Sequence, residues 1–413
     1  MEKKIVQPMA SRAFINEGDD IILSINAEAK ARIKQGEDII NASIGTLFDE
    51  DGHFSSIPII NQALQANLDV DGRSYPTVGG GPKFEQGILD WLLYGESEAI
   101  RKEFKTRVVA TTGGTGAVTL ALRNYTELHQ TVLIPSPGWA NYKAIISQVE
   151  GNYLFYSLFD EHLRFNLTEV RRLAEEVVKR EGRLFLIIND PGHNPTGYTM
   201  SEEEMDGLID LLNELSKQAP TVLCFDIAYF DFTSASRSRL MFRKLHRMND
   251  TILPLFCFSA SKTFSIYGLR LGALVAFSRS EQVIQNFTLA SLSVARAIWS
   301  CSNAHAIETV SSLLSTKQQQ TILWEQLALE REMLAKRGAL FMEEAQQNKL
   351  SVFPYKSGFF ITLLAPDANK IAEDLKKVGI FVLPMKNQYL RVALSCITLA
   401  QTHGLAAKIK QYL

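Results

Sequence analysis

Between residues 107 and 277 the chain alternates short apolar runs with segments of helical periodicity. Continuous apolar runs of this length are typical of strands that are buried on both faces of a sheet. A capping box at Ser201 and Glu204 begins one of the intervening helices. Strand and helix in alternation predict an α/β fold with a mostly parallel central sheet flanked by helices. The expected strands are 107–111, 131–135, 183–188, 221–226, 252–258 and 272–277.

The two ends of the chain follow a different pattern. The stretch up to about Asn41 and the stretch 303–350 are helical by periodicity. After residue 350, strand patterns surround a helix at 369–377. We predict a large domain over residues 51–302 and a small α+β domain built from both ends of the chain. Residues 1–50 form the N-terminal part of the small domain. Residues 303–413 supply an interdomain helix and then the C-terminal part of the small domain. The expected strands there are 351–355, 358–364, 381–384 and 388–394.

Composition narrows the class of protein. Of 413 residues, 46% are hydrophobic and 21% are charged, which is ordinary for globular proteins. The net charge, 43 − 45 = −2, gives no reason to expect a nucleic-acid or membrane partner. The charged start breaks at Pro8 without an apolar signal region, and no apolar run approaches the about 20 residues of a membrane span. We therefore expect a soluble, cytoplasmic protein.

The four cysteines fit neither a disulfide scaffold nor a zinc site. We interpret Cys224, Cys257, Cys301 and Cys396 as small buried hydrophobes, and we expect no metal.

Candidate chemistry follows the predicted strands, since ligands of open parallel sheets bind beyond the carboxyl ends. After strand 107–111, Gly114 and Thr115 open a helix, whose free N–H groups suit a phosphate. After strand 131–135, Trp139 lies in a Pro/Gly loop and could stack on a planar ring. A glycine-rich turn and a core tryptophan are the alternatives.

The next two strand ends carry an amide, a carboxylate and a phenol. Asn194, in a turn fixed by Pro195 and Gly197, can donate a hydrogen bond to an oxygen on a ring. Asp226 ends an apolar strand, where an unpaired carboxylate is costly and needs a cationic partner. Tyr229 can hold a phenol near the same ligand. A tight turn and a turn-capping aspartate are the alternatives.

A lysine segment follows strand 252–258. Lys262 lies among the hydroxyls of Ser259 and Ser261, and Arg270 follows eight residues later. A partly desolvated lysine is a nucleophile for carbonyl groups, and an arginine can bind a phosphate. In the last predicted strand, Arg391 could bind a carboxylate with two hydrogen bonds, or extend to solvent from a sheet edge.

From about Ile44 to Leu394, these motifs resemble, in order, the class I aminotransferases, the aspartate-aminotransferase-like enzymes of fold type I that use pyridoxal 5′-phosphate (PLP). Segment 259–272 matches the family's lysine signature at every defined position. The resemblance implies that Lys262 attaches to the cofactor and moves protons, with Asp226 on the pyridine nitrogen and Asn194 and Tyr229 on the 3′ oxygen. It implies further cofactor contacts from Trp139 on the ring and, on the phosphate, from Gly114, Thr115, Ser259, Ser261 and Arg270.

The resemblance also implies substrate and partner contacts. Arg391 would bind the substrate α-carboxylate, with Asn194 and Gly45 nearby. Tyr75 resembles a tyrosine that reaches the phosphate of the neighbouring subunit, which implies a homodimer with shared active sites. Arg296 lies near the place where dicarboxylate-specific members keep an arginine from the other subunit, although the spacer to Asn303 is longer here.

The implied activity is ping-pong transfer of an α-amino group from an amino acid to a 2-oxo acid. An aspartate donor and an aromatic donor both remain open. A PLP-dependent C–S β-lyase on the same fold is the alternative, because the cofactor machinery is shared. A non-catalytic PLP-binding regulator is a remote alternative, since only about 40 residues, without a basic helix-turn-helix pattern, precede the catalytic-type region.

Overall fold

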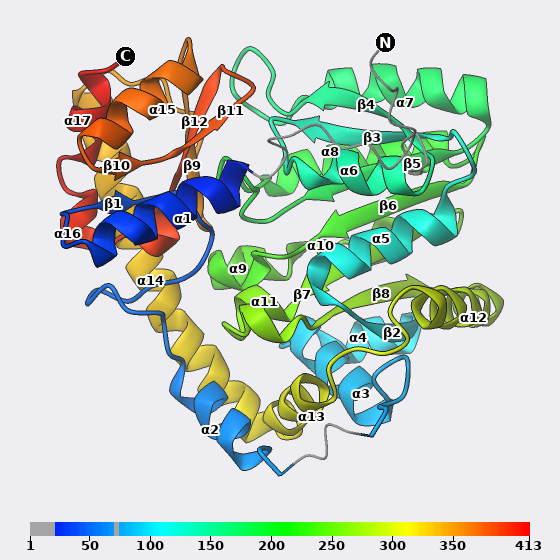
Figure 1. Ribbon diagram of the computed structural model, residues 1–413. Coiled ribbons are helices and arrows are strands. Elements are labelled where there is room, and N and C mark those ends of the chain that lie inside the picture. Colours follow the sequence, from blue (N-terminus) through cyan, green and yellow to red (C-terminus); the bar gives the residue numbers. More distant parts are fainter. Residues whose placement is uncertain (1–20, 70–73) are drawn as a thin grey trace, which may run out of the picture.

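The computed structural model describes residues 21–69 and 74–413 (Figure 1). The first part of the expected N-terminal helical stretch therefore lies outside the described residues. Within them, seven strands form one sheet in the order β2-β8-β7-β6-β5-β3-β4. The strand β8 alone runs in the direction opposite to the other six. The strands are β2 Lys105–Thr111, β3 Thr131–Ser136, β4 Asn152–Ser157, β5 Leu184–Asn189, β6 Thr221–Asp226, β7 Ile252–Ser259 and β8 Gly272–Ser278.

The six expected strands and the α/β class are confirmed, whereas β4 was not predicted. This strand pairs only with β3, at the edge of the sheet, and only one of its six residues is fully buried. An edge strand needs no continuous apolar run, so its sequence, Asn-Tyr-Leu-Phe-Tyr-Ser, carries a weaker signal.

Successive residues of the central strands feed two separate cores, as the period of two requires. In β5, Leu184, Leu186 and Ile188 belong to one core, while Phe185 and Ile187 belong to the other. The second core is covered by α5 Gly113–Tyr125, α6 Asn141–Gln148 and α12 Glu281–Ile298. The first is covered by α2 Pro58–Ala66, α3 Pro82–Leu92, α7 Leu167–Glu181, α8 Glu202–Leu215, α13 Ala304–Leu313 and α14 Lys317–Gln347. The capping box that begins α8 at Ser201 is present.

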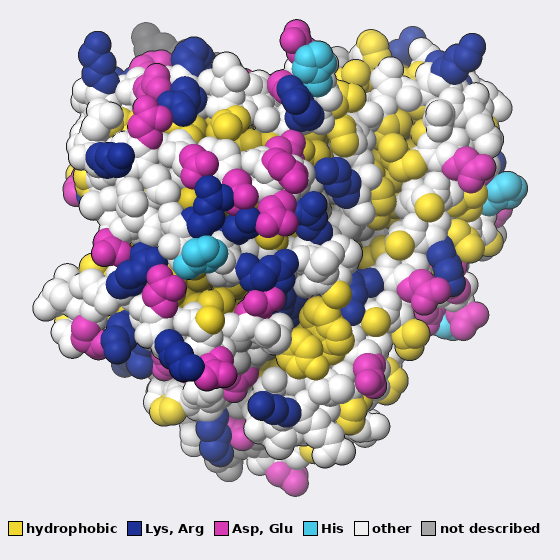
Figure 2. Space-filling view, turned by 180° about the vertical axis from the view of Figure 1, so that it is seen from behind, with side chains coloured by type: hydrophobic (Ala, Val, Ile, Leu, Met, Phe, Trp, Pro, Cys, Tyr) yellow, Lys and Arg dark blue, Asp and Glu magenta, His cyan; other side chains and the backbone are white. Residues whose placement is uncertain are grey.

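Shorter helices complete the region around the sheet. They are α4 Ser97–Glu103, α9 Ala235–Ser238, α10 Leu240–Arg243 and α11 Ala260–Thr263. Among the described residues, no helix is long and apolar enough to cross a membrane. On the face seen in Figure 2, basic and acidic side chains are interspersed.

Both ends of the described chain build a second unit, which lies at the upper left of Figure 1. Its antiparallel sheet has the order β11-β12-β9, and β1 pairs in parallel with β10. Helix α1 joins it where Arg32 Nη1 donates to the Lys376 carbonyl at 2.6 Å. The elements are α1 Ile21–Lys34, β1 Ile40–Asn41, β9 Phe360–Leu364, α15 Ala368–Lys377, β10 Ile380–Phe381, β11 Leu383–Met385, β12 Tyr389–Ala393, α16 Leu399–Thr402 and α17 Leu405–Lys410.

Two predictions for this unit need correction. No strand forms at 351–355, where Val352 makes only an isolated bridge to Leu363 and Pro354 lacks an N–H for a ladder. The strand expected at 381–384 is divided between β10 and β11, which pair with different partners. The domain boundaries at residues 50 and 302 remain predictions.

The long helix α14 is tied to loops from both chain ends through one buried arginine. Arg337 donates from Nε to Glu50 Oε1 at 2.8 Å, from Nη2 to the Phe48 carbonyl at 2.9 Å and from Nη1 to the Leu394 carbonyl at 3.1 Å. These bonds fix the segment that precedes α2 against the end of β12.

The cysteines are all free thiols. Cys224 and Cys257 are buried on neighbouring strands, with their sulfur atoms 3.6 Å apart. Cys301 and Cys396 are only partly buried, so the expectation of four buried cysteines is wrong for these two.

Candidate active site

The carboxyl ends of β5, β6 and β7 meet the start of α5 at a cavity of about 170 Å³. Every cofactor residue expected from the sequence lines this cavity, with the exception of Tyr75. The lining comprises Gly114, Thr115, Trp139, Asn189, Asn194, Asp226, Ala228, Tyr229, Ser259, Ser261, Lys262, Tyr267 and Arg270. The parallel sheet thus brings together residues from five distant sequence motifs.

Asp226, the last residue of β6, is only 7% exposed. Its Oδ2 accepts a hydrogen bond from the Tyr142 hydroxyl at 2.6 Å, and its Oδ1 accepts one from the Ala228 N–H at 3.1 Å. Burial raises the pKa of this carboxyl, whereas the bonds from Tyr142 and Ala228 and the charge of Lys262 lower it. Among the described residues, no cation lies within ion-pair distance of the carboxylate.

Lys262 lies in the short helix α11, directly after β7. Its Nζ donates to the Gly45 carbonyl at 2.9 Å and lies 4.6 Å from the centre of the Tyr267 ring. Burial lowers the pKa of the amine to about 7. The positive charges of Arg391 and Arg270 also lower this pKa, whereas the negative charge of Asp226 raises it. A large share of this amine is therefore neutral, and nucleophilic, at neutral pH.

A buried ion pair holds the backbone beside this lysine. Thr263 Oγ1 donates to Asp231 Oδ2 at 2.7 Å, and Trp91 Nε1 donates to the same oxygen at 3.0 Å. Arg239 Nη1 donates to Asp231 Oδ1 at 2.8 Å, and both partners are at most 2% exposed. Asp231 follows Tyr229 by two residues, so one carboxylate fastens the segments of two cavity residues.

The start of α5 and Arg270 form an end of the cavity suited to an anion. Gly113 has φ +73°, and a Cβ there would lie 2.3 Å from an Arg270 guanidinium nitrogen. The N-cap residue Thr112 makes no side-chain cap bond, which leaves helix N–H groups available. Arg270 Nη1 donates to Ser261 Oγ at 3.0 Å, and no carboxylate pairs with Arg270 within 21–69 or 74–413.

A second arginine without a counter-ion comes from the small sheet. Arg391, on β12, is 4% exposed. Its Nη2 donates to the Ser43 carbonyl at 2.7 Å and its Nη1 to Asn194 Oδ1 at 3.3 Å, while its Nε has no partner. Burial lowers the pKa of this guanidinium to about 10. A buried arginine with free donors and no carboxylate among the described residues favours an anionic ligand.

The loop at Gly45 passes close to both cations. Its carbonyl accepts the bond from Lys262, and a Cβ on Gly45 would lie 2.5 Å from Phe360 Cζ. The Phe360 ring in turn lies 4.3 Å from the Arg391 guanidinium carbon. A side chain at position 45 would therefore displace the ring that supports Arg391.

Four expected site residues are absent from the lining of this cavity: Arg391 and Gly45, which contact its lining residues Asn194 and Lys262, and the exposed Tyr75 and Arg296. Tyr75 is 85% exposed. Arg296, near the end of α12, is also exposed, and its Nη1 donates to Ser300 Oγ at 2.6 Å. The roles expected for both depend on a second subunit and remain predictions.

The sequence reasoning assigned no role to Asn189 or Tyr142. Asn189 Nδ2 donates to the Asp226 carbonyl at 2.8 Å, and its Oδ1 accepts from the Asn194 N–H at 2.7 Å. Tyr142 donates to the Asp226 carboxylate. The signal available in the sequence was Asp226 itself, because a carboxylate at the end of a buried strand requires nearby donors.

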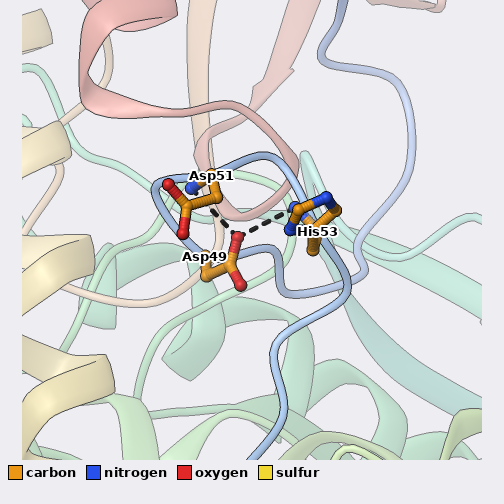
Figure 3. Close-up of side chains that lie close together, drawn as sticks. All are labelled: Asp49, Asp51 and His53. Carbon is orange, nitrogen blue, oxygen red and sulfur yellow. Dashed lines mark hydrogen bonds between the residues drawn. The ribbon is translucent and has the colours of Figure 1, made fainter.

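One group of potential metal ligands lies outside this cavity, at Asp49, Asp51 and His53 (Figure 3). Asp49 Oδ1 accepts the backbone N–H groups of Asp51 at 3.0 Å and of His53 at 2.8 Å. The closeness of the three side chains is therefore explained by a turn that the Asp49 carboxylate closes.

Known proteins are similar to this chain over most of its length. An aspartate aminotransferase of Pseudomonas aeruginosa is 28% identical over 316 residues, which cover 74% of this chain and 75% of that protein. The solved structure of an aminotransferase from Anaerococcus prevotii superposes with a TM-score of 0.92 at 30% identity, and the match covers 98% of this chain and 99% of that one.

A further solved structure shares the fold at lower identity. It is an aromatic-amino-acid aminotransferase from Burkholderia pseudomallei covalently bound to pyridoxal phosphate, with a TM-score of 0.78 at 20% identity and a match that covers 98% of this chain and 100% of that one. The family model of the class I and II aminotransferases matches residues 37–409. The chain therefore belongs to the aminotransferase class I and II family.

Proposed function

We propose that the cavity binds PLP and that the protein transfers an α-amino group from an amino acid to a 2-oxo acid by a ping-pong mechanism. One observation carries the proposal: Asp226 and Arg270 line one cavity, Arg391 contacts its lining residue Asn194, and none of the three has a partner of opposite charge among the described residues. Asp226 and Arg391 are buried, and an unpaired charge in a protein interior is costly, so these two residues indicate ligands that complete them.

The residues fit the cofactor group by group. The free N–H groups at the start of α5 and the guanidinium of Arg270 suit its phosphate. Asp226 suits the pyridine nitrogen, and Trp139 provides an aromatic ring beside it. Asn194 and Tyr229 suit the 3′ oxygen, and Lys262 supplies a partly neutral amine for the aldehyde.

Bound PLP supplies an electron sink for the negative charge that develops at the substrate Cα. The Asp226 carboxylate holds a proton on the ring nitrogen by electrostatic attraction. Arg391 and Asn194 orient the amino acid through its α-carboxylate. With PLP bound, Lys262 Nζ would take the proton from Cα and deliver it to the cofactor carbon that bears the transferred nitrogen. The resulting 2-oxo acid leaves, and a second 2-oxo acid then enters.

The proposed substrates are aspartate or an aromatic amino acid as donor. Similar proteins of both kinds support this choice. Replacing Arg296 with Ala tests the aspartate option: a lower ratio of aspartate to phenylalanine turnover supports a contact with the side-chain carboxylate, and an unchanged ratio contradicts it.

We also propose a homodimer with shared active sites. Tyr75 and Leu289 are 85% and 70% exposed, so the isolated chain leaves large apolar side chains in water. Analytical ultracentrifugation distinguishes a dimer from a monomer. The cytoplasmic location remains a prediction, which fractionation of producing cells tests.

The central experiment saturates the purified protein with PLP and records its visible absorption before and after borohydride. A band that borohydride removes, together with 2-oxoglutarate-dependent turnover in a panel of amino donors, supports the proposal. A colourless protein contradicts it. Release of pyruvate and ammonia from cystathionine without transamination would instead favour the β-lyase.

A further inference from the structure

We infer that Tyr142 is a positioning residue whose phenol holds the Asp226 carboxylate in place and stabilises its negative charge. The inference rests on the proposed function, in which Asp226 pairs with the pyridine nitrogen. It concerns a residue that lies behind the cavity, since Tyr142 belongs to α6 and is absent from the cavity lining.

The geometry gives each carboxylate oxygen one donor from the protein. Tyr142 Oη lies 2.6 Å from Oδ2, and the Ala228 N–H lies 3.1 Å from Oδ1. Short O–H···O⁻ bonds of this kind are stronger than bonds between neutral groups. Because Tyr142 is 1% exposed, water does not compete for this contact.

The titratable groups that face Asp226 differ in how strongly they stabilise its negative charge. They come from four directions: Lys262 from α11, Tyr229 from the following segment, Cys257 from β7 and Tyr142 from α6. Lys262 is the cation of this set, but its charge has a weaker influence on the Asp226 pKa than the Tyr142 bond. Burial raises the pKa of the Asp226 carboxyl, and the bond from the Tyr142 phenol is the strongest of the influences that lower it.

The direction of the bond does not change near neutral pH. Burial and the neighbouring Asp226 raise the pKa of Tyr142 well above its ordinary value, so the phenol stays protonated and donates. Burial likewise raises the pKa of Cys257, which remains a neutral thiol. Tyr142 therefore acts as a permanent donor to the carboxylate rather than as a proton acceptor.

Tyr142 also supports a second cavity residue. Its ring lies edge-on to the Trp139 ring, with centroids 5.1 Å apart and an interplanar angle of 88°. One side chain thereby contacts both the carboxylate and the indole proposed to hold the pyridine ring.

Tyr156 provides a matched control. It is also 1% exposed, and its hydroxyl donates to the Ile187 carbonyl at 3.0 Å. It belongs to the other core of the sheet and does not line the cavity. Replacing either tyrosine with Phe removes one buried phenolic hydrogen bond, but only Tyr142→Phe removes a donor from Asp226.

The experiment measures the dissociation constant of PLP from the full-length protein and its two variants between pH 5 and 9, and the pKa of Asp226 by ¹³C NMR. We expect Tyr142→Phe to weaken PLP binding about 10-fold or more and to raise the Asp226 pKa, from the usual strength of hydrogen bonds to charged groups. Tyr156→Phe should leave both quantities near their original values.

Equal PLP affinity and an equal Asp226 pKa in Tyr142→Phe and the unmodified protein would overturn the inference. Failure of the unmodified protein to bind PLP would instead overturn the proposed function. If Tyr142→Phe does not fold, the Tyr142 hydroxyl proton of the unmodified protein is observed by NMR. A slowly exchanging resonance that moves in Asp226→Asn supports the bond, and its absence contradicts it.

Discussion

The seven-stranded sheet has a cavity at each end of its parallel strands, and the two cavities differ in charge. We call the end where these strands begin the amino edge and the end where they finish the carboxyl edge. At the amino edge, where β3, β4 and β5 begin, an open groove of about 860 Å³ is lined by Arg180, Arg183, Glu127 and Glu181, among others. Each of these arginines is paired: Arg183 with Glu127, and Arg180 with Glu181 at 2.8 Å. At the carboxyl edge, the cavity of about 170 Å³ is five times smaller, and its charges lack such partners among the described residues.

This comparison teaches that unpaired charge, rather than volume, distinguishes the candidate active site. Paired surface charges contribute little and call for no ligand. Arg391, 4% exposed without an anion, and Asp226, 7% exposed without a cation, are each stable only with compensation from elsewhere. The following predictions test whether the two edges differ in function as they do in charge.

The largest effect is expected for Lys262→Ala. Loss of the amine removes both the attachment point for the cofactor and the group that moves the Cα proton, so turnover should fall by at least about 10⁴-fold. Steady-state kinetics with 2-oxoglutarate as acceptor measure this loss. Substantial activity in this variant would show that the chemistry does not depend on the carboxyl edge as described.

Arg391→Lys should reduce kcat/KM by about 10²- to 10³-fold. Lysine keeps the charge but loses the planar pair of donors that matches a carboxylate. Comparing an amino acid with its decarboxylated amine provides the control, since the amine lacks the α-carboxylate and should lose far less. An equal loss for both substrates would argue against carboxylate recognition by Arg391.

The lowered pKa of Lys262 predicts how stability varies with pH in the cofactor-free protein. Between about pH 7 and the ordinary lysine value of 10.5, the unfolded chain binds this proton more than the folded one does. The free energy of unfolding should therefore rise with pH in this window, by about 5 kcal/mol, relative to Lys262→Met. Urea denaturation at several pH values measures the difference, and a constant difference would contradict the lowered pKa.

The smallest effect is expected for Arg183→Ala at the amino edge. The ion pair with Glu127 is partly exposed, so its loss should change the free energy of unfolding by no more than about 1 kcal/mol. kcat/KM should stay within about two-fold of the unmodified protein. A large loss of activity would mean that the amino edge also takes part in function.

The sequence predicted the central sheet well because its strands are buried on both faces and read as continuous apolar runs. The same criterion failed for β4, whose edge position leaves Asn152 and Ser157 exposed. It also failed at Val352, because apolar residues beside Pro354 pack without forming a ladder. The division of β10 from β11 depends on which distant strand each one meets, which local pattern does not encode.

Motif spacing identified most of the side chains that line the cavity, since each of these follows a strand end or opens a helix. It could not supply contacts that depend on tertiary structure. The bond from Tyr142 to Asp226 joins residues 84 positions apart. The pairing of Arg239 with Asp231 joins two interior charges whose positions show no pattern until the chain is folded. The subunit contacts predicted for Tyr75 and Arg296 would likewise need a second chain.

The parallel pairing of Ile40 with Ile380 has a consequence for how the protein is made. The guanidinium of Arg391 also binds the Ser43 carbonyl, 348 positions earlier in the chain, so the two parts of this site are synthesised far apart in time. A polypeptide that ends before residue 391 would lack this arginine, and the complete site can form only after residue 391 has been added.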